Sequence, residues 1–300
     1  MKTKLLIEQH FHGCFGIDFN TAAVDDVLYL SKEILKYGVG GIFPTLVTDS
    51  VENIKRQIRI IKTAAQKQTS DMAHILGIHL EGIFINPLKK GIHDEKLFLA
   101  LTAENFKLIE DDFIKIITLA PELDQGLIKY LKNIKGIKIQ AGHCIGGDLT
   151  GCSGVTHIFN AMEGISHKKP SAALSALVND NIYTEVIADG VHLNDDVLKL
   201  VFRSKPADKI LLVSDCLPAA KSNLTEMTFA GEKIFYDGQR AASKDGVLAG
   251  SAVLLPDIIK LLAQKGLFNP QFIENPYKYH SIDIEGGLEF DEEYNIAGVF

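Results

Sequence analysis

Residues 2–16 read KTKLLIEQHFHGCFG, an apolar run that ends in two histidines and two glycines. Alternate side chains of an extended strand point to the same side, so His10 and His12 share one face. Two imidazoles on one face fill a core poorly but can bind a cation. Gly13 and Gly16 allow the backbone to turn sharply just beyond them. The stretch therefore predicts a strand that ends in candidate metal ligands.

Similar runs recur along the whole chain, and most are separated by stretches with helical periodicity. The eight predicted strands span residues 4–9, 40–44, 75–80, 114–119, 137–141, 155–159, 183–187 and 210–214. The predicted helices span residues 24–37, 51–68, 102–110, 127–132, 174–179, 195–202 and 252–264. Near-continuous apolar strands that alternate with helices indicate a parallel sheet buried on both faces. Eight such units predict an α/β fold closed into a (β/α)8 barrel, a TIM barrel.

Two segments depart from this alternation. The segment near residues 225–245 predicts a small hairpin insertion, because YDGQ at 236–239 is a turn signal. Residues 282–300 are too few for a domain and predict a C-terminal tail. A single barrel domain over residues 1–281 accounts for the remainder.

The composition argues against several classes of partner. Of the 300 residues 46% are hydrophobic, and the net charge is −7 with both signs interspersed. No basic stripe interleaved with aromatic residues is present, which argues against nucleic acid. No apolar run reaches the roughly 18 residues of a membrane span. The four cysteines lack framework spacing and nothing resembles a signal peptide, so the sequence predicts a cytoplasmic protein.

Acidic and imidazole side chains follow most of the predicted strands. In a parallel barrel these positions meet at the carboxyl-terminal mouth, where catalytic residues lie. The residues are His10, His12, Glu81, Glu122, His143, His157, Asp189, His192 and Asp215. A single histidine at a strand end is more often a hydrogen-bonded structural group than a ligand, and Glu122 is better suited to orienting a neighbour than to catalysis. Their joint occurrence at strand ends favours one shared site.

Glu81 and Asp215 are carboxylates in apolar sequence contexts, so each is expected to need a charged or hydrogen-bonding partner. Glu81 lies in apolar surroundings, and Asp215 follows the apolar run ILLVS. Burial of an unpaired carboxylate costs several kcal/mol. A divalent cation held by Glu81, His143 and His157 would remove this cost, and two histidines plus one carboxylate with an open position form a catalytic zinc-type ligand set.

Seven segments, in order, resemble the N-acetylglucosamine-6-phosphate deacetylases of the amidohydrolase superfamily. They are GIHLEGIFINPLKKGIHD, ITLAPE, AGHC, VTHIFNAM, IADGVHL, VSDCLPAA and GVLAGS. The resemblance implies metal-dependent hydrolysis of the N-acetyl group of N-acetylglucosamine 6-phosphate, which gives glucosamine 6-phosphate and acetate. It also implies one or two divalent ions, zinc with iron as the alternative, and suggests a homodimer.

The resemblance further implies roles for individual residues. The implied metal ligands are Glu81, His143 and His157, with His10 and His12 for a second ion. The implied catalytic residues are Asp215, as general acid and base, and His93, which contacts the acetyl carbonyl. The implied sugar-phosphate contacts are Asn160, Ala161 and His192, with Lys168 at the position of a phosphate-binding arginine.

Several features depart from the family pattern. Lys168 offers a point charge where arginine offers a two-pronged contact. Ile83 replaces a proline, and the small β-sandwich domain of the family is expected to be largely absent, since the first metal motif begins at residue 10. Two alternatives therefore stay open. One is an amidohydrolase that acts on a related N-acylated sugar or another amide, and the other is a non-catalytic protein that binds a sugar phosphate.

Overall fold

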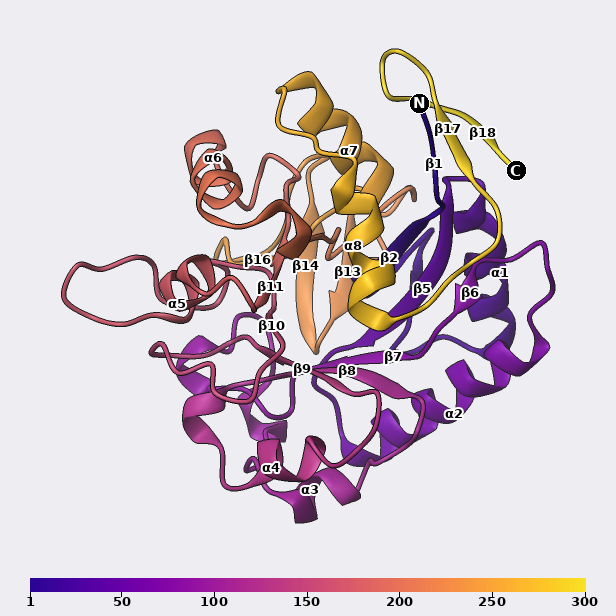
Figure 1. Cartoon of the computed structure of the whole chain (residues 1–300). Coiled ribbons are helices and arrows are strands. Elements are labelled where there is room, and N and C mark those ends of the chain that lie inside the picture. Colours follow the sequence, from indigo (N-terminus) through magenta and orange to yellow (C-terminus); the bar gives the residue numbers. More distant parts are fainter.

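The computed structural model describes residues 1–300 and confirms the predicted barrel. Eight parallel strands form one curled sheet in the order β2, β5, β7, β8, β9, β10, β11 and β12 (Figure 1). Their bounds are Leu6–Phe11, Val39–Leu46, Ile78–Glu81, Ile114–Leu119, Lys138–Ala141, Gly154–Val155, Tyr183–Val186 and Ile210–Leu212. A short strand, β6 (His74–Ile75), also pairs with β5. Nearly all side chains of the eight strands are buried, as a sheet covered on both faces requires.

The barrel closes at the carboxyl-terminal ends of its first and last strands. β2 and β12 form no strand ladder with each other. Instead, the backbones of residues 8–12 and 214–216 approach one another, and the Asp215 N–H donates to His10 O at 2.9 Å. We call these two segments the seam. The seam brings the two ends of the sheet together on the side where the candidate ligands lie.

Helices cover the outside of the sheet (Figure 1). They are α1 (Val24–Leu35), α2 (Val51–Lys67), α3 (Ala103–Lys107), α4 (Leu127–Leu131), α5 (Ala172–Val178), α6 (Asp195–Ser204) and α7 (Leu255–Gln264). Single-turn 3₁₀ helices are η1 (Pro87–Lys89), η2 (Glu95–Leu97), η3 (Pro121–Leu123) and η4 (Ala207–Lys209). In α2, Ile54, Ile58 and Ile61 lie three or four residues apart and form the buried face, while Ser50 caps the first turn.

An eighth helix, α8 (Gln271–His280), is absent from the sequence-based prediction. Pro270 is its N-cap, where proline is tolerated, but Pro276 lies inside the helix, and an interior proline ordinarily argues against one. The helix nevertheless packs against β2 and β12. Its Tyr277 hydroxyl donates to Leu5 O at 2.7 Å. Tertiary packing against β2 and β12 therefore outweighs the local sequence preference.

The segment predicted to carry a hairpin forms a four-stranded antiparallel sheet, which we call the meander. Its strands are β13 (Glu226–Phe229), β14 (Glu232–Tyr236), β15 (Ala241–Ser243) and β16 (Leu248–Gly250). Phe229 and Ile234 of the meander pack with Val47 and Ile92 of the barrel in a small apolar cluster. The meander is therefore held against the barrel rim.

Short strands complete the structure. β3 (Gly13–Cys14) pairs with β4 (Ile17–Asp18), and β1 (Lys2–Thr3), β17 (Leu288–Phe290) and β18 (Ile296–Val299) form a three-stranded antiparallel sheet. Residues 282–300 thus pair with the start of the chain, and the two termini lie near each other (Figure 1).

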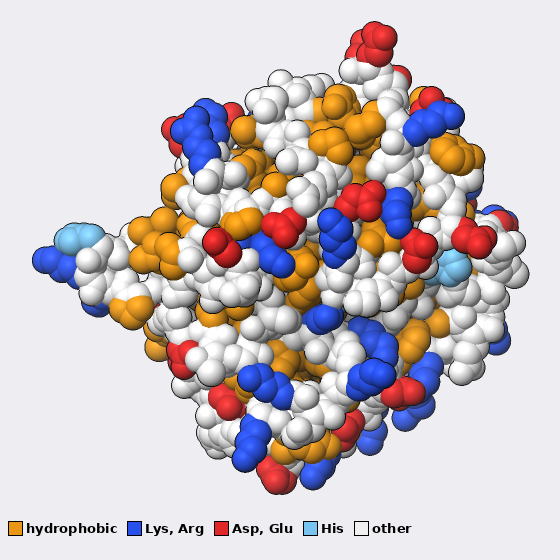
Figure 2. Space-filling model, in the orientation of Figure 1, with side chains coloured by type: hydrophobic (Ala, Val, Ile, Leu, Met, Phe, Trp, Pro, Cys, Tyr) orange, Lys and Arg blue, Asp and Glu red, His pale blue; other side chains and the backbone are white.

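The surface carries both charge signs. Figure 2 shows acidic and basic side chains interspersed on one face, without a basic stripe. None of the helices is both long enough and apolar enough to cross a membrane.

Candidate active site

A cavity of about 560 Å³ opens at the carboxyl-terminal ends of the barrel strands. Its walls include residues 87–93, which follow β7, and residues 247–250 of the meander. The predicted site residues that line it are His12, Glu81, His93, His143, His157, Asn160, Ala161, His192 and Asp215. His10 is fully buried and lies against Glu81. The barrel therefore brings nearly all the predicted residues to one place.

Glu81, the last residue of β7, lies at the centre of the candidate ligands. Its Oε2 atom is 3.2 Å from His10 Nε2 and 3.1 Å from His12 Nε2. Its Oε1 atom is 2.8 Å from His157 Nε2 and 3.4 Å from His143 Nε2. Each carboxylate oxygen thus faces a different pair of histidines, and Glu81 joins two candidate cation positions.

Asp215 completes the first candidate cation position, the one beside His10 and His12. Its Oδ1 atom lies 3.0 Å from His12 Nε2 and 3.5 Å from His10 Nε2. Four ligands around zinc at about 2.0–2.1 Å lie roughly 3.3 Å from one another, close to the separations in this group. In addition, His10 Nε2 and Asp215 Oδ1 are buried without a hydrogen-bond partner. Because a bound cation would satisfy such atoms, the residues present fit a divalent ion.

The backbone is strained at three of these residues. His143, His157 and Asp215 have φ values of 48°, 27° and 52° in the left-handed region. For residues other than glycine this conformation costs about 1–3 kcal/mol. All three lie just beyond barrel strands, where the turn directs their side chains into the shared cluster.

Charges within the cluster stabilise one another. Burial lowers the pKa of His12, but Asp215 and Glu81 more than offset it and raise that pKa to about 9. The pKa of His10 is likewise well above its ordinary value, because carboxylates outweigh burial. Burial raises the pKa of Glu81, yet the histidines hold it well below its usual range. A cation that binds here must therefore displace imidazole protons.

His93 presents a neutral donor to the cavity. Thr48 Oγ1 accepts the Ile83 N–H at 2.8 Å and lies 2.8 Å from His93 Nδ1, and the Thr48 N–H donates to the same nitrogen at 3.4 Å. Because Nδ1 accepts, the ring hydrogen resides on Nε2. Burial and the neighbouring His143 lower the pKa of His93 to about 3, so the ring stays neutral. A proline at position 83 would have no N–H and could not make this contact with Thr48.

Two further predicted residues line the cavity with cationic or polar groups. His192 Nδ1 lies 2.8 Å from Asp189 Oδ2, and although burial opposes it, this contact raises the pKa of His192. Asn160 donates from Nδ2 to His157 O at 3.2 Å, which fixes its position beside the cluster. The cavity lining therefore holds an imidazole whose protonated form Asp189 favours, together with the Asn160 amide, and both groups are suited to an anionic or hydroxyl-rich ligand.

Lys168 lies away from the cavity. It is exposed within residues 163–170, a loop outside the cavity lining. Lys89 and Lys90 do line the cavity. They form the KK pair of GIHLEGIFINPLKKGIHD, where nothing in the spacing marks them as cavity residues. Lys89 O also accepts the His143 Nδ1–H at 2.8 Å, which leaves Nε2 of that ring free toward Glu81.

Two acidic residues outside the cavity lining support the site from behind. Glu122 accepts the Asn86 Nδ2–H at 2.9 Å and the Ile145 N–H at 2.6 Å, so it orders the loops behind the cavity. Glu185 is fully buried on β11 beneath the cluster. Sequence analysis misses Glu185 because it occupies an interior position of an ordinary strand.

Comparisons with known proteins agree with this geometry. No model of a protein family matches the chain. The N-acetylglucosamine-6-phosphate deacetylase of Bacillus subtilis is 32% identical over 82% of this chain and 65% of the relative. The enzyme of the same name from Caenorhabditis elegans is 31% identical over 85% of this chain and 67% of the relative. The chain belongs to the N-acetylglucosamine-6-phosphate deacetylase family. It spans about two thirds of the length of these curated family members.

Solved structures of this family share the fold. The deacetylase of Pasteurella multocida matches with a TM-score of 0.90 and 25% identity over 100% of this chain and 84% of that one. The Thermotoga maritima deacetylase also gives a TM-score of 0.90, at 24% identity over 100% of this chain and 86% of that one. Both comparisons support the barrel architecture.

Proposed function

We propose that this chain hydrolyses the acetamido group of N-acetylglucosamine 6-phosphate to glucosamine 6-phosphate and acetate. The observation that carries the proposal is the convergence of four histidines, Glu81 and Asp215 at the floor of a cavity in a member of this family. A cavity of about 560 Å³ is of the size that holds a small-molecule ligand.

The proposed cofactor is a divalent cation, zinc with iron as the alternative. Two positions that share Glu81 are available: His10, His12 and Asp215 would complete one, and His143 and His157 the other. When bound, the cation lowers the pKa of water to about 7 and polarises the acetyl carbonyl.

Asp215 is the proposed general base and acid. Burial alone would raise the pKa of Asp215, but His10 and His12 outweigh burial and hold the pKa below its ordinary value. The carboxylate is therefore ionised at neutral pH. Asp215 accepts a proton from the attacking water and transfers it to the sugar nitrogen as the carbon–nitrogen bond breaks. His93 donates its Nε2–H to the carbonyl oxygen, which gains negative charge as water adds.

The phosphate of the substrate would be held by cationic groups at the cavity rim. Lys89, Lys90 and His192 line the cavity, whereas Lys168 is exposed outside it. We therefore propose that Lys89 and Lys90 take much of the role that the resemblance implies for Lys168. Contacts to the phosphate, away from the amide, supply binding energy that positions the reacting bond. Asn160 and Ala161 would contact the sugar.

Acetate release measures the proposed function directly. The purified protein, loaded with zinc, should release acetate from N-acetylglucosamine 6-phosphate much faster than from N-acetylglucosamine, and a chelator should abolish both rates. Equal rates on the two substrates would favour the alternative of a related N-acylated sugar. An absence of turnover with retained binding of the phosphorylated sugar would favour a non-catalytic binding protein.

A second substrate belongs in the same assay. A relative from Escherichia coli O157:H7, 28% identical over 86% of this chain, is named N-acetylgalactosamine-6-phosphate deacetylase. We expect the gluco epimer to be preferred, and a higher kcat/KM for the galacto epimer would reassign the substrate. The homodimer and the cytoplasmic location stay predictions, and light scattering during size-exclusion chromatography tests the first.

A further inference from the structure

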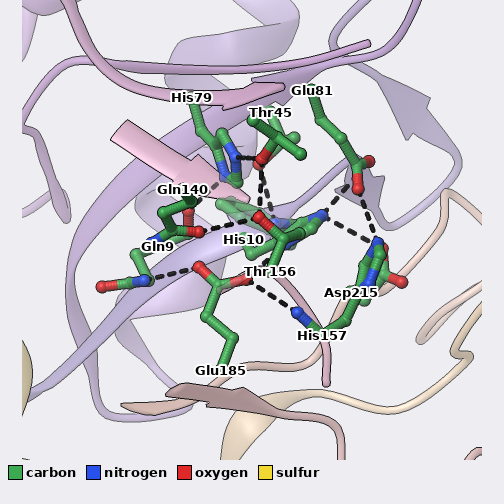
Figure 3. A network of polar contacts seen from close by, with 12 residues as sticks. Gln9, His10, Thr45, His79, Glu81, Gln140, Thr156, His157, Glu185 and Asp215 are labelled. Atoms are coloured by element: carbon green, nitrogen blue, oxygen red, sulfur yellow. Dashed lines mark hydrogen bonds and ion pairs between the residues drawn. The ribbon is translucent and has the colours of Figure 1, made fainter. Parts of the chain in front are cut away.

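Glu185 is a buried charge that the proposed reaction does not use. It lies on β11, directly beneath the candidate ligands, with its side chain inside the barrel (Figure 3). Glu185 Oε2 is 2.9 Å from His10 Nδ1 and accepts the His157 N–H at 3.3 Å. Glu185 Oε1 accepts a Gln9 Nε2–H at 2.6 Å. Burial of a carboxylate costs free energy unless the group is paired. The partners of Glu185 are two candidate ligands, His10 and His157, and the neighbouring Gln9.

The contact with His10 determines which ring nitrogen can bind a cation. Because the carboxylate of Glu185 only accepts, Nδ1 of His10 must carry a hydrogen. The other nitrogen, Nε2, points to Glu81 and Asp215, at 3.2 and 3.5 Å. A cation that binds His10 therefore displaces the proton on Nε2. The hydrogen on Nδ1 stays bonded to the ring and donates to Glu185.

Gln9 is fixed in turn by α8, the helix that packs against β2 and β12. His280 Nε2 of α8 lies 3.0 Å from Gln9 Oε1. This contact occupies the oxygen of the Gln9 amide and turns its nitrogen toward Glu185. Glu185 is thus held in one orientation by residues outside the cavity lining.

The same observations exclude Glu185 as a ligand of its own cation. Glu185, His10 and His79 lie close enough to suggest a metal group. However, His79 Nδ1 is 3.0 Å from Gln9 O and His79 Nε2 is 2.8 Å from Thr118 Oγ1. Both ring nitrogens of His79 are therefore occupied by hydrogen bonds, and none is left for a cation.

We propose that Glu185 is a positioning residue that orients His10 and thereby forms the cation position made by His10, His12, Glu81 and Asp215. The inference rests on the metal-dependent function proposed above. Glu185 contacts the ring of His10 but only the backbone of His157. Its loss should therefore weaken the position on the His10 side far more than the position of Glu81, His143 and His157.

Zinc binding tests this inference without measuring activity. The proteins to compare are wild type, Glu185→Gln, Glu185→Ala and the control Thr184→Val. Thr184 is the buried neighbour on β11, and its Oγ1 has no hydrogen-bond partner, so valine leaves the network intact. Zinc affinity is measured by competition with a chromophoric chelator, and anomalous scattering at the zinc edge locates each ion in crystals.

In wild type and Thr184→Val we expect zinc on the His10 side. In Glu185→Ala the affinity at that position should fall about 10–100-fold, as is typical when the partner of a metal-bound histidine is lost. The position of Glu81, His143 and His157 should stay within about threefold. Glu185→Gln keeps the shape without the charge and should fall between, which covers a failure of the alanine variant to fold.

The outcomes separate the two proposals. Wild type with no bound zinc would overturn the proposed function and this inference together. Wild type with zinc only at Glu81, His143 and His157 would overturn this inference alone. So would unchanged affinity on the His10 side in both Glu185 variants, or an equal loss at both positions.

Discussion

Replacing Glu8 by glutamine tests the seam quantitatively. Glu8 is buried on β2, and its carboxylate accepts the Ser214 N–H at 3.2 Å and the His10 N–H at 3.3 Å. Burial raises the pKa of Glu8 from 4.5 to about 8, although these hydrogen bonds lower it. Below about pH 8 the folded protein therefore holds a neutral carboxyl group at the seam, and glutamine imitates that group.

The sign of the effect follows from proton binding. The unfolded chain releases this proton near pH 4.5, whereas the folded chain keeps it until about pH 8. Between those values the folded state binds more protons, so its stability falls as pH rises. Each pH unit costs up to about 1.4 kcal/mol, so wild type should lose about 3 kcal/mol through Glu8 between pH 5 and pH 8. Glu8→Gln should show no such loss.

Urea unfolding at pH 5, 6, 7 and 8, with a chelator present, measures this difference. The unfolding free energy of Glu8→Gln minus that of wild type should increase by about 3 kcal/mol across the series. Glu292→Gln, at an exposed position, is the matched control and should follow wild type. Parallel curves for Glu8→Gln and wild type would refute a neutral carboxyl group at the seam.

Three further outcomes follow from the site. With saturating zinc, Asp215→Asn should lose about 10²–10⁴-fold in kcat while the Kd for the phosphorylated sugar changes little, and unchanged turnover would refute its role as base. Replacing both Lys89 and Lys90 by alanine should raise KM for the phosphorylated sugar at least about tenfold and leave KM for N-acetylglucosamine unchanged. Lys168→Ala should have the same KM as wild type for both sugars. The reverse pattern would return the phosphate-binding role to Lys168. Chelation should lower Tm in differential scanning fluorimetry by about 5 °C or more, and an unchanged Tm would argue against a resident cation.

The sequence predicts the barrel and most of its candidate ligands for a physical reason. Buried parallel strands require apolar residues at nearly every position, so a histidine or carboxylate at a strand end is conspicuous. That contrast identifies Glu81, His143, His157 and Asp215 before any coordinates are known. In the structure His143 and His157 lie in one group with Glu81, and Asp215 lies in a second group that shares Glu81.

The remaining features depend on tertiary packing. α8 contains Pro276 and polar residues, and only its contacts with β2 and β12 explain it. Glu185 sits in a short strand, YTEV, whose pattern does not reveal that its side chain points inward beneath the ligands. The position of Lys168 depends on the path of an exposed loop, which local sequence does not determine.

Three of the four candidate ligands of the cation position made by His10, His12, Glu81 and Asp215 come from opposite ends of the barrel sequence. His10 and His12 precede the first helix, and Asp215 follows the last barrel strand. Few backbone hydrogen bonds join them, among them His12 N–H to Cys216 O at 2.8 Å. A cation there would cross-link the two, so metal starvation should expose the protein to proteases before it unfolds globally. Deuterium uptake at the His12 and Asp215 amides should therefore become faster when a chelator removes the cation.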